Sequence, residues 1–174
     1  KVIYLGTFSK SIAPSLRISY MVLPLHLLKK YQESCSFYST TVSKIQQEVL
    51  REFIRGGYFG RHLNKMRGIY KNKHDFLVGE LKKKNWVENI AGDNAGLHVL
   101  VQVNTTLTEE EICKKAAECG IRLMGIREHY IHTPPEGRPV LLLRYRKPDK
   151  QEIQKGLQIL ESIVLENRIP LPLR

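Results

Sequence analysis

The residues of this 174-residue chain that could do chemistry lie close together near its beginning. Within eleven residues the sequence places two hydroxyls, Thr7 and Ser9, a primary amine, Lys10, and a guanidinium, Arg17. Lysine and arginine supply positive charge, and hydroxyls add hydrogen-bond donors that suit the oxygens of a small anion. The spacing therefore indicates a site for an anionic ligand. The alternative is that these side chains are simply solvent-exposed, as in many surface loops.

Two short runs of strand-forming residues flank this segment, at 2–5 and 18–23. The residues between them, 6–17, are small and polar with glycine and proline as turn residues, which favours a functional loop over a tight hairpin. Pro24 suits the start of a helix, and apolar residues recur further along the chain at steps of three and four. Helices are therefore expected at 25–33, 41–55 and 58–84.

The second half of the chain alternates strand and helix patterns. Thr108 and Glu111 form the capping-box pattern of a helix start, and this helix is expected to end at Gly120. Pro148 favours the start of a last helix. Apolar runs predict strands at 97–103, 121–126 and 140–145. The expected fold class is α/β, with helices on one side of a small sheet.

Composition and charge narrow the possible functions. No stretch resembles a membrane span or a signal peptide, so we expect a cytoplasmic chain without a membrane partner. The cysteines and histidines show no metal-ligand spacing, so no metal site is expected. The net charge of +11 arises from residues 1–84, which hold 16 Lys and Arg against 5 Asp and Glu. This excess fits a solvated basic face, an anion site or a nucleic-acid surface.

The anion-site residues belong to a longer pattern. Gly6-Thr7-Phe8-Ser9-Lys10, followed by Pro14, Leu16-Arg17 and Tyr20-x-Val22-x-Pro24, resembles the lysine segment of fold-type I aminotransferases of class I/II. The likeness is greatest to MocR-type regulators of the GntR family. Weaker similarity continues through Arg61-His62-x-x-x-Met66-Arg67-x-x-Tyr70 and Ala95-Gly96-Leu97-His98 to the closing strand and helix. The resemblance implies the C-terminal part of the fold of pyridoxal 5′-phosphate (PLP)-dependent transferases.

The resemblance also implies a role for each residue of the anion site. Lys10 matches the lysine that holds PLP as a Schiff base. Thr7, Ser9 and Arg17 match the residues that hold the cofactor's phosphate, to which a guanidinium fork is well suited.

A substrate residue is less well marked. Enzymes of the family grip the substrate carboxylate with an arginine three residues before an aromatic residue of the last strand. Counting back from Tyr145, that position is Leu142. Arg144 lies on the same strand face and is the candidate substitute, with a shifted register or a lost substrate site as alternatives.

The resemblance further implies how a complete protein would be organised. Residues 1–57 would end a large PLP-binding subdomain, 58–84 would form a basic connecting helix, and 85–174 a small α/β subdomain. The first half of the fold would precede Lys1, so the chain alone is expected to be inactive. The complete protein would be a homodimer that binds DNA through an upstream winged-helix module.

Two other functions share part of this pattern. The first alternative is a fragment of a genuine PLP-dependent amino-acid aminotransferase, which would carry the same lysine segment. The second is a basic nucleic-acid-binding protein, which would show a strongly salt-dependent affinity for DNA.

Overall fold

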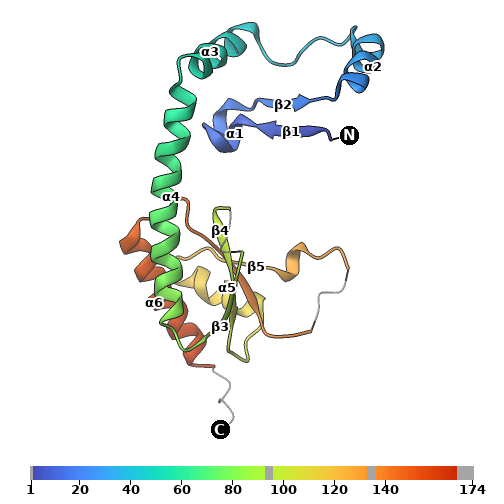
Figure 1. Cartoon of the computed structure of the whole chain (residues 1–174). Coiled ribbons are helices and arrows are strands. Elements are labelled where there is room, and N and C mark those ends of the chain that lie inside the picture. Colours follow the sequence, from blue (N-terminus) through green and yellow to red (C-terminus); the bar gives the residue numbers. More distant parts are fainter. Residues whose placement is uncertain (1, 93–95, 133–135, 168–174) are drawn as a thin grey trace. The chain divides into compact units, whose positions relative to one another are not determined.

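The computed structural model describes residues 2–92, 96–132 and 136–167 and divides into two units (Figure 1). Unit 1 comprises residues 1–67 and unit 2 residues 68–174. Both units contain helices and a small antiparallel sheet, and the expected α/β class is confirmed. The three-part division at residues 57 and 84 stays a prediction.

Unit 1 is built around a two-stranded antiparallel sheet. β1 (Tyr4–Thr7) pairs with β2 (Ser19–Val22). The segment between them is not a plain loop, because it contains α1 (Phe8–Ser11) and the 3₁₀ helix η1 (Pro14–Leu16). Three longer helices follow, of which the last continues into unit 2: α2 (Leu25–Cys35), α3 (Lys44–Arg55) and α4 (Tyr58–Lys82).

Unit 2 contains a four-stranded antiparallel sheet in the order β3-β4-β6-β5. Its strands are β3 (Val87–Ala91), β4 (His98–Val103), β5 (Met124–Gly125) and β6 (Val140–Arg144). The unit also contains the second part of α4, the 3₁₀ helix η2 (Arg127–His129), α5 (Glu109–Glu118) and α6 (Lys150–Leu165).

The helices of unit 2 cover one face of this sheet (Figure 1). Alternate residues of β4 and β6, such as Val101 and Leu141, are buried in a single cluster with side chains of α4, α5 and α6. Each fully buried aliphatic side chain contributes about 1.5–3 kcal/mol relative to an exposed one. The alternate pattern therefore holds the helices in place. Within the described part of unit 2, no helix lies against the opposite face of the sheet.

Two capping boxes fix the starts of α5 and α6. Thr108 accepts a hydrogen bond from the Glu111 amide at 3.2 Å and the Glu111 carboxylate accepts one from the Thr108 amide at 2.8 Å, as expected from the sequence. α6 begins at Lys150 rather than at Pro148, because Asp149 and Glu152 form an equivalent box. Such caps stabilise a helix by about 1 kcal/mol.

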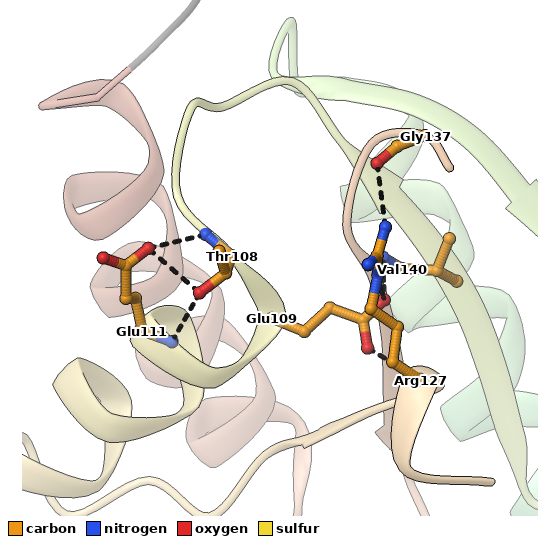
Figure 2. A network of polar contacts seen from close by, with 6 residues as sticks. All are labelled: Thr108, Glu109, Glu111, Arg127, Gly137 and Val140. Carbon is orange, nitrogen blue, oxygen red and sulfur yellow. Dashed lines mark hydrogen bonds and ion pairs between the residues drawn. The ribbon is translucent and has the colours of Figure 1, made fainter. Parts of the chain in front are cut away.

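A buried carboxylate joins α5 to the ends of two strands (Figure 2). Glu109 accepts hydrogen bonds from the Arg127 amide at 2.8 Å and the Val140 amide at 2.9 Å. Its side chain is 6% exposed and its other neighbour is the Arg127 guanidinium, 3.9 Å away. A side chain at Gly125 would collide with this carboxylate. Glu109 therefore holds Arg127, shortly after β5, close to Val140 at the start of β6.

Several element boundaries differ from the expectation. The first strand lies at 4–7 instead of 2–5, and the strand expected at 121–126 is reduced to the two residues of β5. β3 was not expected at all. Ala95, the first residue of the Ala95–His98 motif, lies outside the described residues.

Candidate functional site

The lysine segment is held between the two strands of unit 1. Thr7 ends β1 and caps α1, because its hydroxyl accepts a hydrogen bond from the Ser9 amide at 3.2 Å. The same hydroxyl donates to the Ile18 carbonyl at 3.3 Å, and the Phe8 amide donates to that carbonyl at 2.9 Å. α1 is thereby tied to the start of β2, and Lys10 lies in the last turn of this short helix.

Lys10 and Arg17 are both exposed. Arg17 directly precedes Ile18, so the contacts of Ile18 bring Arg17 to the same end of the sheet as α1. Among the described residues, neither side chain has a hydrogen bond or an ion pair. No acidic residue precedes Glu33 in the sequence. The β1–β2 connection therefore carries two cations without a local acidic partner.

The hydroxyls of this connection differ in what they can still bind. The single proton of Thr7 is used on the Ile18 carbonyl, so in this conformation the hydroxyl has no proton left for an anion. Ser11, which the sequence did not single out, donates its hydroxyl to the Thr7 carbonyl at 3.3 Å. Ser9 is half-buried, and no hydrogen bond of its hydroxyl to a described residue is found. Ser9 is thus the hydroxyl best able to donate to a ligand.

A cluster of aromatic side chains packs against the lysine segment at Gly6. In the sheet register Gly6 lies opposite Tyr20, and any side chain at Gly6 would collide with the Tyr20 ring. The Tyr20 ring centroid lies 5.0 Å from that of Phe8 and 6.0 Å from that of Tyr4. Hydrogen bonding with the Tyr4 hydroxyl raises the pKa of Tyr20. This cluster was missed in the sequence analysis, because it depends on the register that pairs Gly6 with Tyr20.

A shallow cavity of about 360 Å³ in unit 1 lies between Phe8 of α1, the start of β2 and α3. Neither Lys10 nor Arg17 lines it. Its walls are mostly apolar, and its one charged residue, Arg51, is already paired with Glu48 at 2.9 Å and Glu52 at 3.2 Å. The cavity therefore adjoins the lysine segment through Phe8 but lacks free charge for an anion.

Arg144 belongs to unit 2, at the end of β6. It is exposed, and Leu142 lies two residues earlier on the same helix-free face. His98 of β4 is its direct neighbour across the sheet. That Leu142 stands where the family pattern has an arginine stays a prediction from the sequence.

The described residues contain no group of three or more His, Cys, Asp or Glu side chains placed to hold a metal ion. Within the same residues, no helix combines the length and the apolar character needed to cross a bilayer.

Comparison with known proteins identifies the family. The family profile described as aminotransferase class I and II matches residues 1–141. The chain belongs to this family. The resemblance inferred from the lysine segment is thereby confirmed.

Known relatives of this aminotransferase family member include regulators. The chain is 37% identical over 163 residues to the uncharacterized HTH-type transcriptional regulator YdeL of Bacillus subtilis (strain 168), which is 93% of this chain and 35% of that protein. It is 29% identical over 177 residues to the probable rhizopine catabolism regulatory protein MocR of Rhizobium meliloti, covering 99% of this chain and 35% of the relative. The chain therefore spans about a third of the length of these relatives.

Solved structures confirm the fold of the family. A multiple substrate aminotransferase from Thermococcus profundus matches with a TM-score of 0.79 at 23% identity, covering 95% of this chain and 41% of that one. Kynurenine aminotransferase from Pyrococcus horikoshii, solved in complex with PMP, matches with a TM-score of 0.77 at 25% identity and the same two coverages. The expected transferase fold is therefore confirmed.

Proposed function

We propose that this chain is the C-terminal half of a PLP-binding, aminotransferase-like effector domain in a transcription regulator of the MocR type. The observation that carries the proposal is the β1–β2 connection, where Lys10 and Arg17 are exposed and have no hydrogen-bond or ion-pair partner among the described residues. The similarity to HTH-type regulators along nearly the whole chain supports the regulator over other members of the family.

The residues of the connection fit the chemical groups of PLP. When bound, PLP supplies an aldehyde that condenses with a lysine amine, with loss of water, and a dianionic phosphate. Lys10 would provide the amine. Arg17 would bind the phosphate through its guanidinium fork, and Ser9 would donate its hydroxyl. Thr7 would act by fixing the start of α1, because its proton is used on the protein.

The sheet of unit 1 supports a larger parent fold. Neighbouring residues of β1, Tyr4 and Leu5, are 58% and 71% exposed, and Met21 and Val22 of β2 are 46% and 56% exposed. Because neighbouring strand residues point to opposite faces, both faces of this sheet are apolar, as in an inner strand pair of a larger sheet. An upstream segment of the parent protein would cover it. The homodimer and the upstream winged-helix module that binds DNA are part of the same proposal.

Labelling of the chain by PLP tests the role of Lys10. The protein is incubated with PLP, reduced with borohydride and mapped by mass spectrometry, with Lys44, an exposed lysine of α3, as the internal reference. We expect weak cofactor binding by the chain alone, with labelling enriched at Lys10 over Lys44. Equal labelling of the two lysines would contradict the proposal.

A matched variant tests the role of Arg17. In Arg17→Gln we expect the enrichment at Lys10 to fall to the level obtained with pyridoxal, which has the same aldehyde but no phosphate. An enrichment that is the same with PLP and pyridoxal in the wild type would remove Arg17 from the proposed site.

A genuine aminotransferase is the second candidate, favoured by the solved enzymes that share the fold. The leucine at position 142 argues against an aminotransferase, because the substrate carboxylate would lack the arginine that the family pattern has there. Turnover of an amino acid by the protein extended upstream would favour the enzyme, whereas a change in DNA binding on addition of an amino acid would favour the regulator.

A further inference from the structure

The charge on the first half of α4 is basic and contains no acid. Between Glu52 and Asp75 the sequence has no Asp or Glu. The same interval has six Lys and Arg residues: Arg55, Arg61, Lys65, Arg67, Lys71 and Lys73. By comparison, α6 has two lysines and two glutamates. The charge on this part of α4 is therefore of one sign instead of balanced.

Helix geometry collects four of these cations on one side of α4. At 3.6 residues per turn, Arg61, Lys65, Arg67 and Lys71 fall within an arc of about 160° and along about 15 Å of the helix. All four are exposed. The other residues within this arc are also exposed, and none of them is acidic or apolar in its side chain: Gly60, Asn64, Gly68 and Asn72. We call Arg61, Lys65, Arg67 and Lys71 the cation arc.

The cation arc is unfavourable for the free helix. Arg61 and Lys65 are four residues apart, as are Arg67 and Lys71, and two like charges at this spacing destabilise a helix. None of the four forms an ion pair within the described part of the chain. The hydrogen bonds of the two arginines go to neutral acceptors, the Gly56 carbonyl at 3.2 Å and the Asn64 side chain at 3.3 Å. An external anion would therefore be the counter-charge of these residues.

The opposite arrangement occurs at the C-terminal end of the same helix. Lys83 forms an ion pair with Glu80, three residues earlier, and Lys84 forms one with Glu161 of α6 at 2.7 Å. The two ends of α4 thus differ in whether the protein itself supplies a carboxylate for each lysine.

We infer that the cation arc binds the phosphate backbone of double-stranded DNA. A duplex carries one negative charge per about 1.7 Å, so a stretch as long as the arc offers about nine. Arginine, lysine and asparagine side chains all bind phosphate oxygens, and such contacts carry no sequence information. A membrane surface fits less well, because a helix that lies on a bilayer inserts apolar side chains, and the arc has none.

The opposite side of α4 is used within the protein. The Phe59 ring centroid lies 5.8 Å from that of Phe8, and Leu77 is buried in the unit 2 core. The helix therefore presents one side only to DNA, which favours contact with the backbone over insertion into a groove. The choice of DNA rests on the regulator part of the proposed function. The inference goes beyond it, because the upstream module is not required.

Fluorescence anisotropy with the 174-residue chain, without PLP, tests this inference. We expect the chain to bind a labelled duplex of about 20 base pairs with a Kd of about 10⁻⁵ M at about 100 mM NaCl. Four phosphate contacts predict a slope of about −3.6 for log K against log salt concentration. Two duplexes of unrelated sequence should bind equally, and phosphatidylserine vesicles at least about tenfold more weakly. Because Lys10 and PLP take no part, a negative result is separate from the outcome of the Lys10 labelling experiment.

Matched variants locate the surface. Lys65→Gln/Lys71→Gln removes one cation from each like-charge pair and should weaken DNA binding by about tenfold and reduce the slope by about two. Lys114→Gln/Lys155→Gln removes the same charge from exposed positions of α5 and α6 and should leave the slope unchanged.

A charge-conserving variant separates loss of charge from loss of structure. Lys65→Arg/Lys71→Arg should bind DNA as the wild type does, and circular dichroism should show the same helix content in all three double variants, since Gln, Lys and Arg are similar helix formers. The inference would be overturned by absence of salt-dependent DNA binding, by equal losses in the two glutamine variants, by loss of binding in the arginine variant, or by tighter binding to vesicles than to DNA.

Discussion

Unit 2 buries seventeen hydrophobic side chains in one cluster, whereas Ile18 is the one buried hydrophobic residue among the described residues of unit 1. The two units do not differ in how apolar their strands are. They differ in how far helices cover their sheets. Three helices pack against one face of the unit 2 sheet, whereas residues on both faces of the β1–β2 sheet are exposed. The candidate cofactor lysine thus lies on the unit with little core of its own, and the candidate substrate residue Arg144 lies on the unit with the large core.

Separation of the two units gives the largest expected effect. Residues 68–174 expressed alone should unfold in one cooperative transition, since their core is internal to the unit. Residues 1–67 alone should show no cooperative transition, because an isolated two-stranded sheet is at best marginally stable in water. Circular dichroism during thermal denaturation measures both. Cooperative unfolding of residues 1–67 would show that unit 1 folds without another segment packed against its sheet.

Two leucines, one buried in unit 2 and one exposed in unit 1, test the same difference at single residues. Leu81 of α4 is 0% exposed in the unit 2 cluster, and Leu5 of β1 is 71% exposed. Leu81→Ala should lower the free energy of unfolding of unit 2 by about 2–5 kcal/mol, since it removes transfer energy and leaves a cavity. Leu5→Ala should change stability by less than about 0.5 kcal/mol. Chemical denaturation of the two variants gives both values, and similar losses would mean that β1 is already covered.

A smaller effect is expected where a polar group completes unit 2. Glu109→Gln should destabilise the unit by about 1–3 kcal/mol, because an amide has one acceptor oxygen for the two amides of Arg127 and Val140. Glu110→Gln is the matched control, as Glu110 is the next residue of α5 and is exposed. Amide hydrogen exchange at residues 125–140 should rise in the first variant only. Equal protection in both variants would remove the role assigned to Glu109.

Local patterns made much of unit 2 predictable from its sequence. The alternation in β4 and the capping box of α5 depend on neighbouring residues, and both were found as expected. β3 was missed because a bulge between Val87 and Asn89 interrupts the period of two on which strand prediction depends.

The candidate sites depended on contacts that the sequence does not display. The pattern identified Lys10 and Arg17, yet the use of the Thr7 proton by Ile18 follows from the pairing of β1 with β2. Likewise, Arg144 was singled out from its place in the last strand. Its neighbour His98 comes from a strand far away in the sequence, and the register alone makes the two adjacent.

The smallest expected effect is the pH dependence of unit 2. Glu161 accepts hydrogen bonds from Lys84 at 2.7 Å and from Trp86 at 3.1 Å, and these hydrogen bonds lower the pKa of the Glu161 carboxyl. A carboxyl with a lowered pKa stabilises the folded state above its ordinary pKa of about 4.3, and this contribution is lost as the pH falls through the folded value. Glu161→Gln should therefore destabilise unit 2 at neutral pH, by less than about 1 kcal/mol, and should flatten the loss of stability in acid. Denaturation from neutral pH into the acid range measures the slope, with the exposed Glu118→Gln of α5 as control. An unchanged slope in Glu161→Gln would mean that the acid sensitivity of the covered unit arises from other carboxyls.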